Sequence, residues 1–145
     1  MDLKDRLLQP ERPGGSKPRK SSEKILIVDD ADMFLKLEEI LLKRTGCEVI
    51  KARNGIEALK RVQEERPRVV LLDIIMPEMN GDVVCKFIKS NPALKDISVI
   101  IVTSRGDEET RDRCARSGCD SYFTKPIEHQ KLLEAVQGYL SVKNY

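Results

Sequence analysis

The chain has 145 residues, of which 40% are hydrophobic and 34% charged, and its formal net charge is +2. This length suits one domain whose apolar residues can fill a single core. No apolar run approaches the ~20 residues of a membrane-spanning helix, and the first residues lack the apolar centre of a signal peptide. We therefore expect a soluble, cytoplasmic protein with no membrane partner.

Positive charge is concentrated near the N-terminus. Residues 1–24 carry seven Lys or Arg and four Asp or Glu, whereas the other 121 residues carry nineteen and twenty. The segment Gln9–Lys24 mixes Pro, Gly, Ser and charged residues without an apolar residue to pack. Residues 1–23 are therefore predicted to form a flexible basic arm, and residues 24–145 the folded domain. Because that domain is nearly neutral and poor in aromatic residues, nucleic-acid binding is not expected.

The cysteines follow no metal-binding or redox motif. Cys47, Cys85, Cys114 and Cys119 include no C-x-x-C pair, and the single histidine, His129, offers no zinc pairing. We expect small, buried free thiols.

From residue 24 onward, short apolar runs alternate with segments of helical character. Strands are predicted over Lys24–Asp30, Cys47–Ala52, Val69–Ile74, Ile97–Ser104 and Asp120–Pro126. Helices are predicted over Asp32–Gly46, Asn54–Pro67, Asp82–Pro92, Asp107–Gly118 and Glu128–Val142. This alternation is typical of an α/β protein with right-handed βαβ units and a parallel sheet between two helical layers. The nearly all-apolar first, third and fourth strands should be central, and the second suits an edge.

Two of these helices place apolar residues on one face, which indicates amphipathic helices. These residues are Phe34, Leu37, Ile40 and Leu41 in the first helix, and Val83, Val84, Phe87 and Ile88 in the third.

Chemically active side chains stand where the predicted strands end. The first strand ends in Asp29 and Asp30, and the third ends in Asp73. The fourth ends with the hydroxyl of Thr103, and the fifth with the ammonium of Lys125. Because ligands in such sheets bind beyond the carboxyl ends of the strands, these groups should converge at one edge.

That set of groups suits phosphoryl transfer. Crowded carboxylates repel one another, and a hard divalent cation such as Mg²⁺ would relieve the repulsion while bridging to a phosphate. Lys125 and Thr103 could help to neutralise the oxygens of a transferring phosphoryl group. Asp73 could be the nucleophile and form an aspartyl phosphate.

Each residue also has a simpler explanation. Asp29 or Asp30 could cap the following helix, and Asp73 could cap a turn. Thr103 could be an ordinary strand-end residue, and Lys125 a solvated surface lysine. The functional interpretation depends on all of these positions falling at strand ends of one parallel sheet.

The motifs ILIVDD, VVLLDIIMPEMNG, VIIVTS and YFTKP, in this order and spacing, resemble those of response regulator receiver domains in two-component signalling. The resemblance covers about residues 23–142. It implies a flavodoxin-like fold, a doubly wound sheet of five parallel strands in the order 2-1-3-4-5. In such domains the peptide bond corresponding to Lys125–Pro126 is often cis.

The resemblance implies a role for each acid of the site. Asp73 corresponds to the phosphoacceptor, and Asp30 and Asp73 bind Mg²⁺ through their carboxylates. Ile75 contributes its backbone carbonyl to the metal, and Asp29 holds the metal mainly through water. Ile75 and Arg105 flank the site, where they could screen or admit water, and the apolar Ile75 favours a longer-lived phosphate.

By the same resemblance, Thr103 and Lys125 contact the phosphoryl oxygens, and Thr103 and Tyr122 form a switch. Movement of Thr103 toward the phosphate leaves a space that Tyr122 fills, which alters the surface of the fourth helix, fifth strand and fifth helix. A downstream protein would bind this surface, and a sensor histidine kinase would supply the phosphoryl group. A homodimer on phosphorylation is also expected. The simpler explanation of Tyr122 is a static, half-buried ring.

The alternative function is a Mg²⁺-dependent phosphatase or phosphotransferase that forms an aspartyl phosphate. Such enzymes commonly carry a second acid two residues after the nucleophile, and here that position is Ile75. The sequence also offers no cap domain to enclose a substrate. An acceptor without turnover of external substrates is therefore favoured. A receiver-like module that is never phosphorylated would not need the complete set of acids with Thr103 and Lys125.

Overall fold

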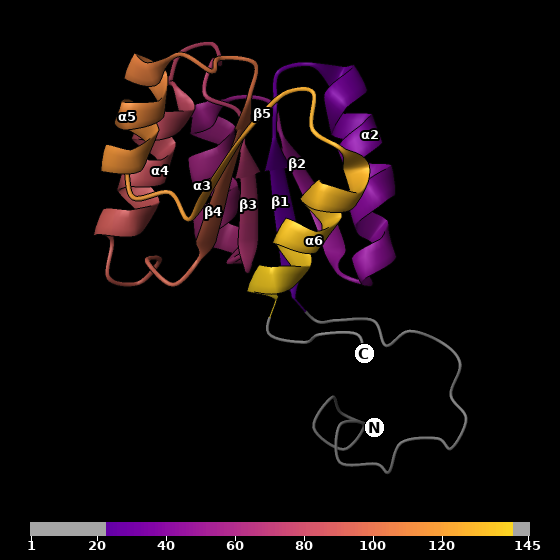
Figure 1. Cartoon of the computed structure of the whole chain (residues 1–145). Coiled ribbons are helices and arrows are strands. Elements are labelled where there is room, and N and C mark those ends of the chain that lie inside the picture. The colour runs from indigo at the N-terminus through magenta and orange to yellow at the C-terminus, as the bar shows by residue number, and fades with distance from the viewer. Residues whose placement is uncertain (1–22, 141–145) are drawn as a thin grey trace, which may run out of the picture.

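The computed structural model describes residues 23–140, and Figure 1 shows how they are arranged. Five parallel strands form one sheet in the order β2-β1-β3-β4-β5, as predicted. They are β1 (Lys24–Val28), β2 (Glu48–Ala52), β3 (Val69–Leu72), β4 (Ser98–Thr103) and β5 (Ser121–Thr124). The predicted arm over residues 1–23 lies outside the described residues except for its last residue, so it stays a prediction.

Helices cover both faces of this sheet. They are α2 (Asp32–Leu42), the short 3-10 helix η1 (Lys43–Thr45), α3 (Gly55–Glu65), α4 (Gly81–Ser90), α5 (Glu108–Arg116) and α6 (His129–Tyr139). In Figure 1, α2 and α6 lie on one side of the sheet, and α3, α4 and α5 lie on the other. This is the predicted doubly wound, flavodoxin-like α/β fold.

Two hydrophobic cores follow from the alternation of side chains along the strands. In β1, Leu26 and Val28 pack toward α3, α4 and α5, whereas Ile25 and Ile27 pack toward α2 and α6. The apolar residues of β3 and β4 divide between the two cores in the same way. Because helices cover both faces, the central strands must be apolar on both, which is the pattern their sequences show.

Local signals in the sequence set several helix ends. Asn54 caps α3, and its Oδ1 accepts the backbone N–H of Glu57 at 2.8 Å. Asp107 caps α5 by accepting both the backbone N–H and the hydroxyl of Thr110. After α2 the chain tightens into η1 and stops at Gly46, whose φ of 81° favours glycine. These ends determine where each βα unit turns back toward the sheet.

Only part of the apolar face predicted for the first helix packs against the sheet. In α2, Phe34, Leu37 and Ile40 are 42%, 48% and 57% exposed, and the buried residues are Leu35, Leu41 and Leu42. In α4, Val84, Cys85 and Ile88 are buried, while Val83 and Phe87 are exposed. Apolar residues fill two adjacent stripes of each helix, and only the packing decides which stripe meets the sheet.

The prediction of buried free thiols is confirmed for three of the four cysteines. Cys47, Cys85 and Cys114 are buried and Cys119 is half-buried, and all four are free thiols. Across residues 23–140, His129 belongs to no group of metal-ligating side chains. None of the described helices combines the length and the apolar character that a membrane crossing requires.

Candidate functional site

An acidic cluster lies at the carboxyl edge of the sheet, beyond β1 and β3. Asp29, Asp30 and Asp73 each place a carboxylate oxygen within 4.8 Å of the other two. Asp29 and Asp73 are only 2% and 9% exposed, whereas Asp30 is exposed to solvent. The structure therefore brings together the three acids that the sequence predicted to converge.

The sheet itself positions these side chains, because its hydrogen bonds continue one residue past the strands. The backbone N–H groups of Asp29 and Asp73 donate to carbonyls of β2 and β1, both at 3.1 Å. The N–H of Lys125 donates to the last carbonyl of β4 at 2.7 Å. The side chains of Asp29, Asp73 and Lys125 are thus carried by backbone that is still paired with a neighbouring strand.

Lys125 approaches the acidic cluster from β5. Its Nζ lies 2.6 Å from Oδ2 of Asp29 and 3.5 Å from Oδ2 of Asp73. The same ammonium lies 4.0 Å from the centroid of the Phe34 ring. The peptide bond between Lys125 and Pro126 is cis, as the resemblance implied. Lys125 is therefore not a solvated surface lysine, since two acids and an aromatic ring hold its charge.

Burial and the neighbouring charges act in opposite directions on the pKa values of Asp73 and Lys125. Burial raises the pKa of Asp73, Lys125 opposes that rise, and the charge of Asp29 adds to it. Burial alone would lower the pKa of Lys125, but the hydrogen bond to Asp29 and the charge of Asp73 outweigh it, so that pKa is raised. A further cation between the acids would favour the ionised form of Asp73.

The donor set suits a hard divalent cation. Mg²⁺ prefers oxygen ligands and keeps several waters, so a few carboxylates suffice, and the exposed Asp30 leaves room for water. Helix capping does not account for Asp29 or Asp30, whereas Asp73 does accept the N–H of Ile75 in the turn that follows it. The N-cap residue of α2 is Ala31, no side chain caps this helix, and Asp29 accepts only the N–H of Ala31 at that end, at 2.9 Å.

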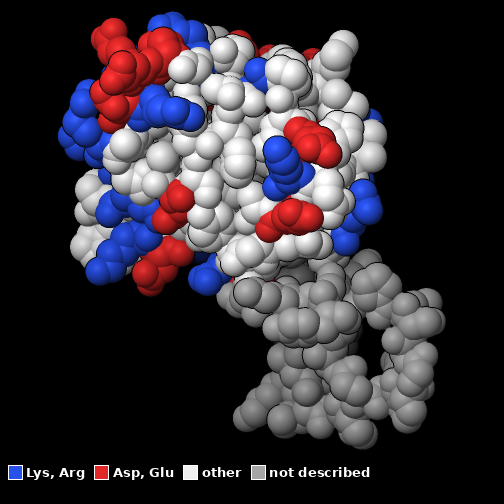
Figure 2. Space-filling view, in the orientation of Figure 1, with Lys and Arg blue, Asp and Glu red and all other residues white. Residues whose placement is uncertain are grey.

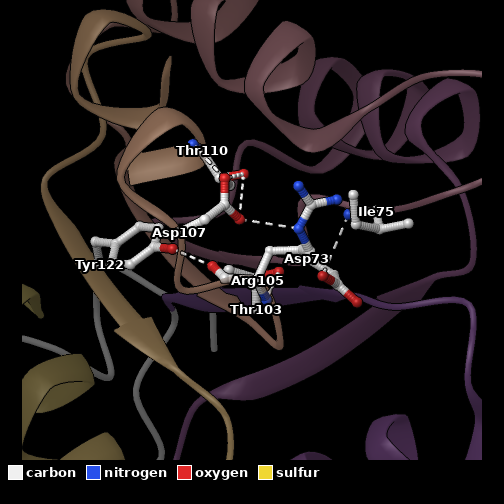
Figure 3. A network of polar contacts seen from close by, with 7 residues as sticks. All are labelled: Asp73, Ile75, Thr103, Arg105, Asp107, Thr110 and Tyr122. Atoms are coloured by element: carbon white, nitrogen blue, oxygen red, sulfur yellow. Dashed lines mark hydrogen bonds and ion pairs between the residues drawn. The ribbon is translucent and has the colours of Figure 1, made fainter. Parts of the chain in front are cut away.

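Thr103 and Ile75 lie on either side of Asp73 in Figure 3. Thr103 is fully buried at the end of β4, and its Oγ1 accepts the N–H of Arg105 at 3.2 Å. The N–H of Ile75 donates to Oδ1 of Asp73 at 3.3 Å, and the Ile75 side chain is 44% exposed. Among the described residues, Thr103 makes no hydrogen bond to Asp73, so the two residues are neighbours at this edge without a direct bond.

Tyr122 connects β5 to the loop between β4 and α5 (Figure 3). Its hydroxyl donates to the backbone carbonyl of Arg105, and the guanidinium of Arg111 lies 5.5 Å from its ring centroid. Arg105 Nε donates to Oδ1 of Asp107, the cap of α5, at 2.9 Å. A rearrangement of the loop at Arg105 would therefore reach both Tyr122 and the start of α5.

Two residues of this edge were not singled out from the sequence. The N–H of Gly81 donates to the carbonyl of Ile74 at 2.8 Å, and a Cβ at Gly81 would lie 2.0 Å from the carbonyl oxygen of Asp73. The Asn-Gly pair that ends the motif signals such a turn, so Gly81 could have been found. Phe34 was assigned only to an apolar face, because nothing in the sequence shows that its ring lies beside Lys125.

Comparison with known proteins adds independent information. The response regulator receiver domain family matches residues 25–137. The polar-differentiation response regulator DivK of Brucella anthropi is 40% identical over 119 residues, which cover 80% of this chain and 94% of DivK. The chemotaxis protein CheY4 of Vibrio cholerae aligns with a TM-score of 0.76 and 28% identity, over 83% of this chain and 100% of CheY4. A CheY-like receiver domain protein from Methanospirillum hungatei aligns with a TM-score of 0.74 and 30% identity, over 81% and 93%.

The family match runs through all five strands and includes the acidic cluster and Lys125. The fold, the acidic edge and the sequence similarity agree with one another. The chain therefore belongs to the response regulator receiver domain family of two-component signalling.

Proposed function

We propose that Asp73 accepts a phosphoryl group, with Mg²⁺ bound at the acidic cluster, from a sensor histidine kinase or a small phosphodonor. The observation that carries this proposal is the convergence of Asp29, Asp30 and Asp73 with Lys125 at the end of a rigid sheet. Burying carboxylates beside one another costs free energy that a purely structural edge would not need to spend. The proposal places the protein in the cytoplasm with its kinase.

In the proposed step, a carboxylate oxygen of Asp73 forms a bond to phosphorus while the bond from phosphorus to the donor breaks. The electron pair of the broken bond leaves with the donor, which is a histidine nitrogen or an acyl oxygen. No general base is required, because the carboxylate attacks as an anion. The N–H of Ile75 and the ammonium of Lys125, at 3.3 and 3.5 Å from Asp73 oxygens, favour that anion. Thr103 would donate its hydroxyl to a phosphoryl oxygen.

The proposed metal ligands follow the family resemblance, and the convergence of the three acids supports them. Bound Mg²⁺ would neutralise charge that gathers on the phosphoryl oxygens. We assign Asp30 and Asp73 as carboxylate ligands and the carbonyl of Ile75 as a third ligand. Asp29 would hold the metal through water. That indirect role suits Asp29, because its Oδ2 is bonded to Lys125 at 2.6 Å and its Oδ1 accepts a backbone N–H at 2.9 Å.

Thr103 and Tyr122 would transmit the phosphorylation to a partner. Movement of Thr103 toward the phosphate would release the N–H of Arg105, whose carbonyl holds the Tyr122 hydroxyl. The surface of α5, β5 and α6 would change as a result and bind a downstream protein or a second copy of the chain. In Figure 2, charged side chains crowd the α5 side of this face, and uncharged residues fill its middle.

The test of the proposed function is modification of Asp73. The full chain is incubated with Mg²⁺ and acetyl phosphate, and its intact mass is measured with Asp73→Asn as the control. We expect the wild-type mass to increase by one phosphoryl group, and we expect no increase in the variant or after chelation of Mg²⁺. An unmodified wild-type chain, or equal modification of Asp73→Asn, would overturn the proposal.

The switch has its own test. Tyr122→Ala should leave phosphorylation intact and weaken capture of partners from a lysate treated with beryllofluoride, because the hydroxyl contact with Arg105 is lost. Loss of both properties, or of neither, would contradict the switch role.

We also propose that the protein does not turn over external phosphoesters. Position 75, where an acid–base catalyst would stand in an aspartyl-phosphate phosphatase, carries the apolar side chain of Ile75. Incubation with a chromogenic phosphomonoester tests this, since release of many equivalents of phosphate per chain would favour the enzyme.

A further inference from the structure

An acid that the proposed function does not use stands on the inner side of α2. Leu35, Glu38 and Leu42 follow one another at helical spacing, and the two leucines are buried in the core between the sheet and its α2 and α6 helices. Glu38 itself is half-buried. Among residues 23–140, no hydrogen-bond or ion-pair partner of its carboxylate is found, so its charge is balanced by no direct contact.

Glu38 shares a cavity with Lys125. The cavity has a volume of about 150 Å³ and lies between α2 and the segment that leads from β5 into α6. Its lining is mostly apolar, and its ionisable members are Glu38, Lys125 and His129. Lys125 also contacts Asp29 and Asp73, so its side chain belongs both to the cavity and to the acidic cluster.

The charge of Glu38 depends on this neighbourhood. Burial raises its pKa to about 7, the charge of Asp29 adds to the rise, Lys125 opposes it, and Asp73 adds a smaller contribution. Conversely, the charge of Glu38 is one of the causes that raise the pKa of Lys125. Near neutral pH the carboxyl of Glu38 is therefore divided between its neutral and ionised forms. Its balance responds to any new charge at Asp73.

We propose that Glu38 is a positioning residue for phosphorylation of Asp73 and acts through Lys125. As an anion, Glu38 attracts the Lys125 ammonium toward the cavity and adds negative charge behind the site that must receive a phosphoryl group. As a neutral acid, it leaves the ammonium free for the phosphoryl oxygens. Phosphorylation should therefore be faster when Glu38 is neutral, and the phosphorylated protein should bind a proton there more readily. This inference rests on the proposed function of Asp73.

Other ionisable groups around α2 do not supply the same effect. Asp29 and Asp73 face Glu38 from the ends of β1 and β3, and their bonds to Lys125 belong to the reaction itself. From β2, Lys51 pairs with the neighbouring Glu39 at 3.3 Å rather than with Glu38. His129 at the start of α6 is exposed and is the remaining ionisable residue of the cavity.

The experiment measures the rate of Asp73 phosphorylation by acetyl phosphate at saturating Mg²⁺, from about pH 5 to about pH 8. The range extends into acid because bound Mg²⁺ offsets the charges of Asp29 and Asp73 and so lowers the pKa of Glu38 below its metal-free value. Wild type is compared with Glu38→Gln. A second variant is Glu38→Leu, whose apolar side chain suits a position between the buried Leu35 and Leu42. The ratio of variant to wild-type rate at each pH cancels the titration of the donor. We expect this ratio to be near one at the acidic end and to rise about three- to tenfold at the alkaline end.

Two variants serve as matched controls. Glu39→Gln removes one negative charge from the adjacent position of the same helix, and its ratio should not change with pH. His129→Gln removes the other ionisable side chain of the cavity and should keep the pH dependence of wild type. A ratio for both Glu38 variants that is independent of pH would overturn the inference while the proposed function stands. Absence of any modification of wild-type Asp73 would instead overturn the proposed function.

Discussion

Ion pairs of equal length stand at opposite edges of the sheet. At the amino edge, Lys24 Nζ lies 2.6 Å from Glu65, and at the carboxyl edge, Lys125 Nζ lies 2.6 Å from Asp29. The side chains of the first pair are 31% and 27% exposed, and those of the second are 12% and 3% exposed. The two edges therefore differ in solvent access rather than in contact geometry.

The pKa of the acid paired with Lys24 and the pKa values of two other acids near Lys125 shift in opposite directions. The hydrogen bond from Lys24 lowers the pKa of Glu65, whereas burial raises the pKa values of Asp73 and Glu38 although Lys125 opposes both. Where water still reaches both partners, one lysine stabilises a carboxylate. Where water is excluded, burial and the neighbouring acids raise the pKa of a carboxyl group by more than one lysine lowers it. The carboxyl edge therefore lacks positive charge, which is the condition that favours a divalent cation.

Replacing the lysine at each edge should give the largest difference in stability between the two edges. Lys125→Met leaves Asp29 buried beside Asp73 without its cation, and we expect the free energy of unfolding to fall by about 3–5 kcal/mol. Lys24→Met removes an exposed pair and should change stability little. Urea unfolding measures both variants. Equal losses would show that burial does not distinguish the two edges.

A second contrast concerns the room available at each edge. Gly81→Ala places a Cβ 2.0 Å from the carbonyl oxygen of Asp73, and the forced backbone shift should cost about 3 kcal/mol. Gly138 lies near the end of α6, and a Cβ added there would have no atom within 4 Å. Gly138→Ala should therefore stabilise the helix by up to about 1 kcal/mol. Thermal unfolding of both variants checks this. A neutral Gly81→Ala would mean that the loop after Asp73 yields easily.

The third prediction concerns pH. The pKa of Glu38 rises from 4.5 to about 7 on folding, so between these values the folded protein holds a proton that the unfolded chain releases. Its stability should fall as the pH rises through this window, and Glu38→Gln should be more stable than wild type above it by about 1–2 kcal/mol. The pKa of Glu65 is lowered, so Glu65→Gln should lose stability above the unfolded value and change little in acid.

Urea unfolding of Glu38→Gln and Glu65→Gln across the pH range shows directly whether each variant is more or less stable than wild type. Shifts of the same sign in both variants would contradict the difference between the two edges.

The smallest expected effect concerns water at the carboxyl edge. The half-exposed apolar side chain of Ile75 lies beside Asp73, where it should hinder water that attacks the phosphate. Ile75→Asn should shorten the phosphate lifetime several-fold without changing stability much. The loss of phosphoryl label after removal of the donor measures it, and an unchanged lifetime would remove this role for Ile75.

Most of the fold could be predicted because its signals are local. Continuous apolar runs indicated strands covered on both faces, and Asn54 and Gly46 indicated helix ends that the structure shows. The last helix was predicted over Glu128–Val142 and is observed over His129–Tyr139, with its predicted end outside the described residues. The order of strands followed from the resemblance and is confirmed.

The candidate site could be predicted in part. Asp29, Asp30, Asp73 and Lys125 converge because parallel strands end at the same edge, and that follows from their positions in the sequence. The stripe of α2 that faces the sheet did not follow, since helix periodicity allows several rotations about the helix axis. The position of Glu38 beside Lys125 therefore remained hidden.

The sequence by itself determined which residues form strands and helices, and which side chains follow the strands, because these depend on neighbouring residues and on the period of each element. Only the tertiary structure decided which charges lose their water. Desolvation depends on residues that are distant in the chain, and at this edge it separates the buried Asp29 from the exposed Asp30, its neighbour in the sequence.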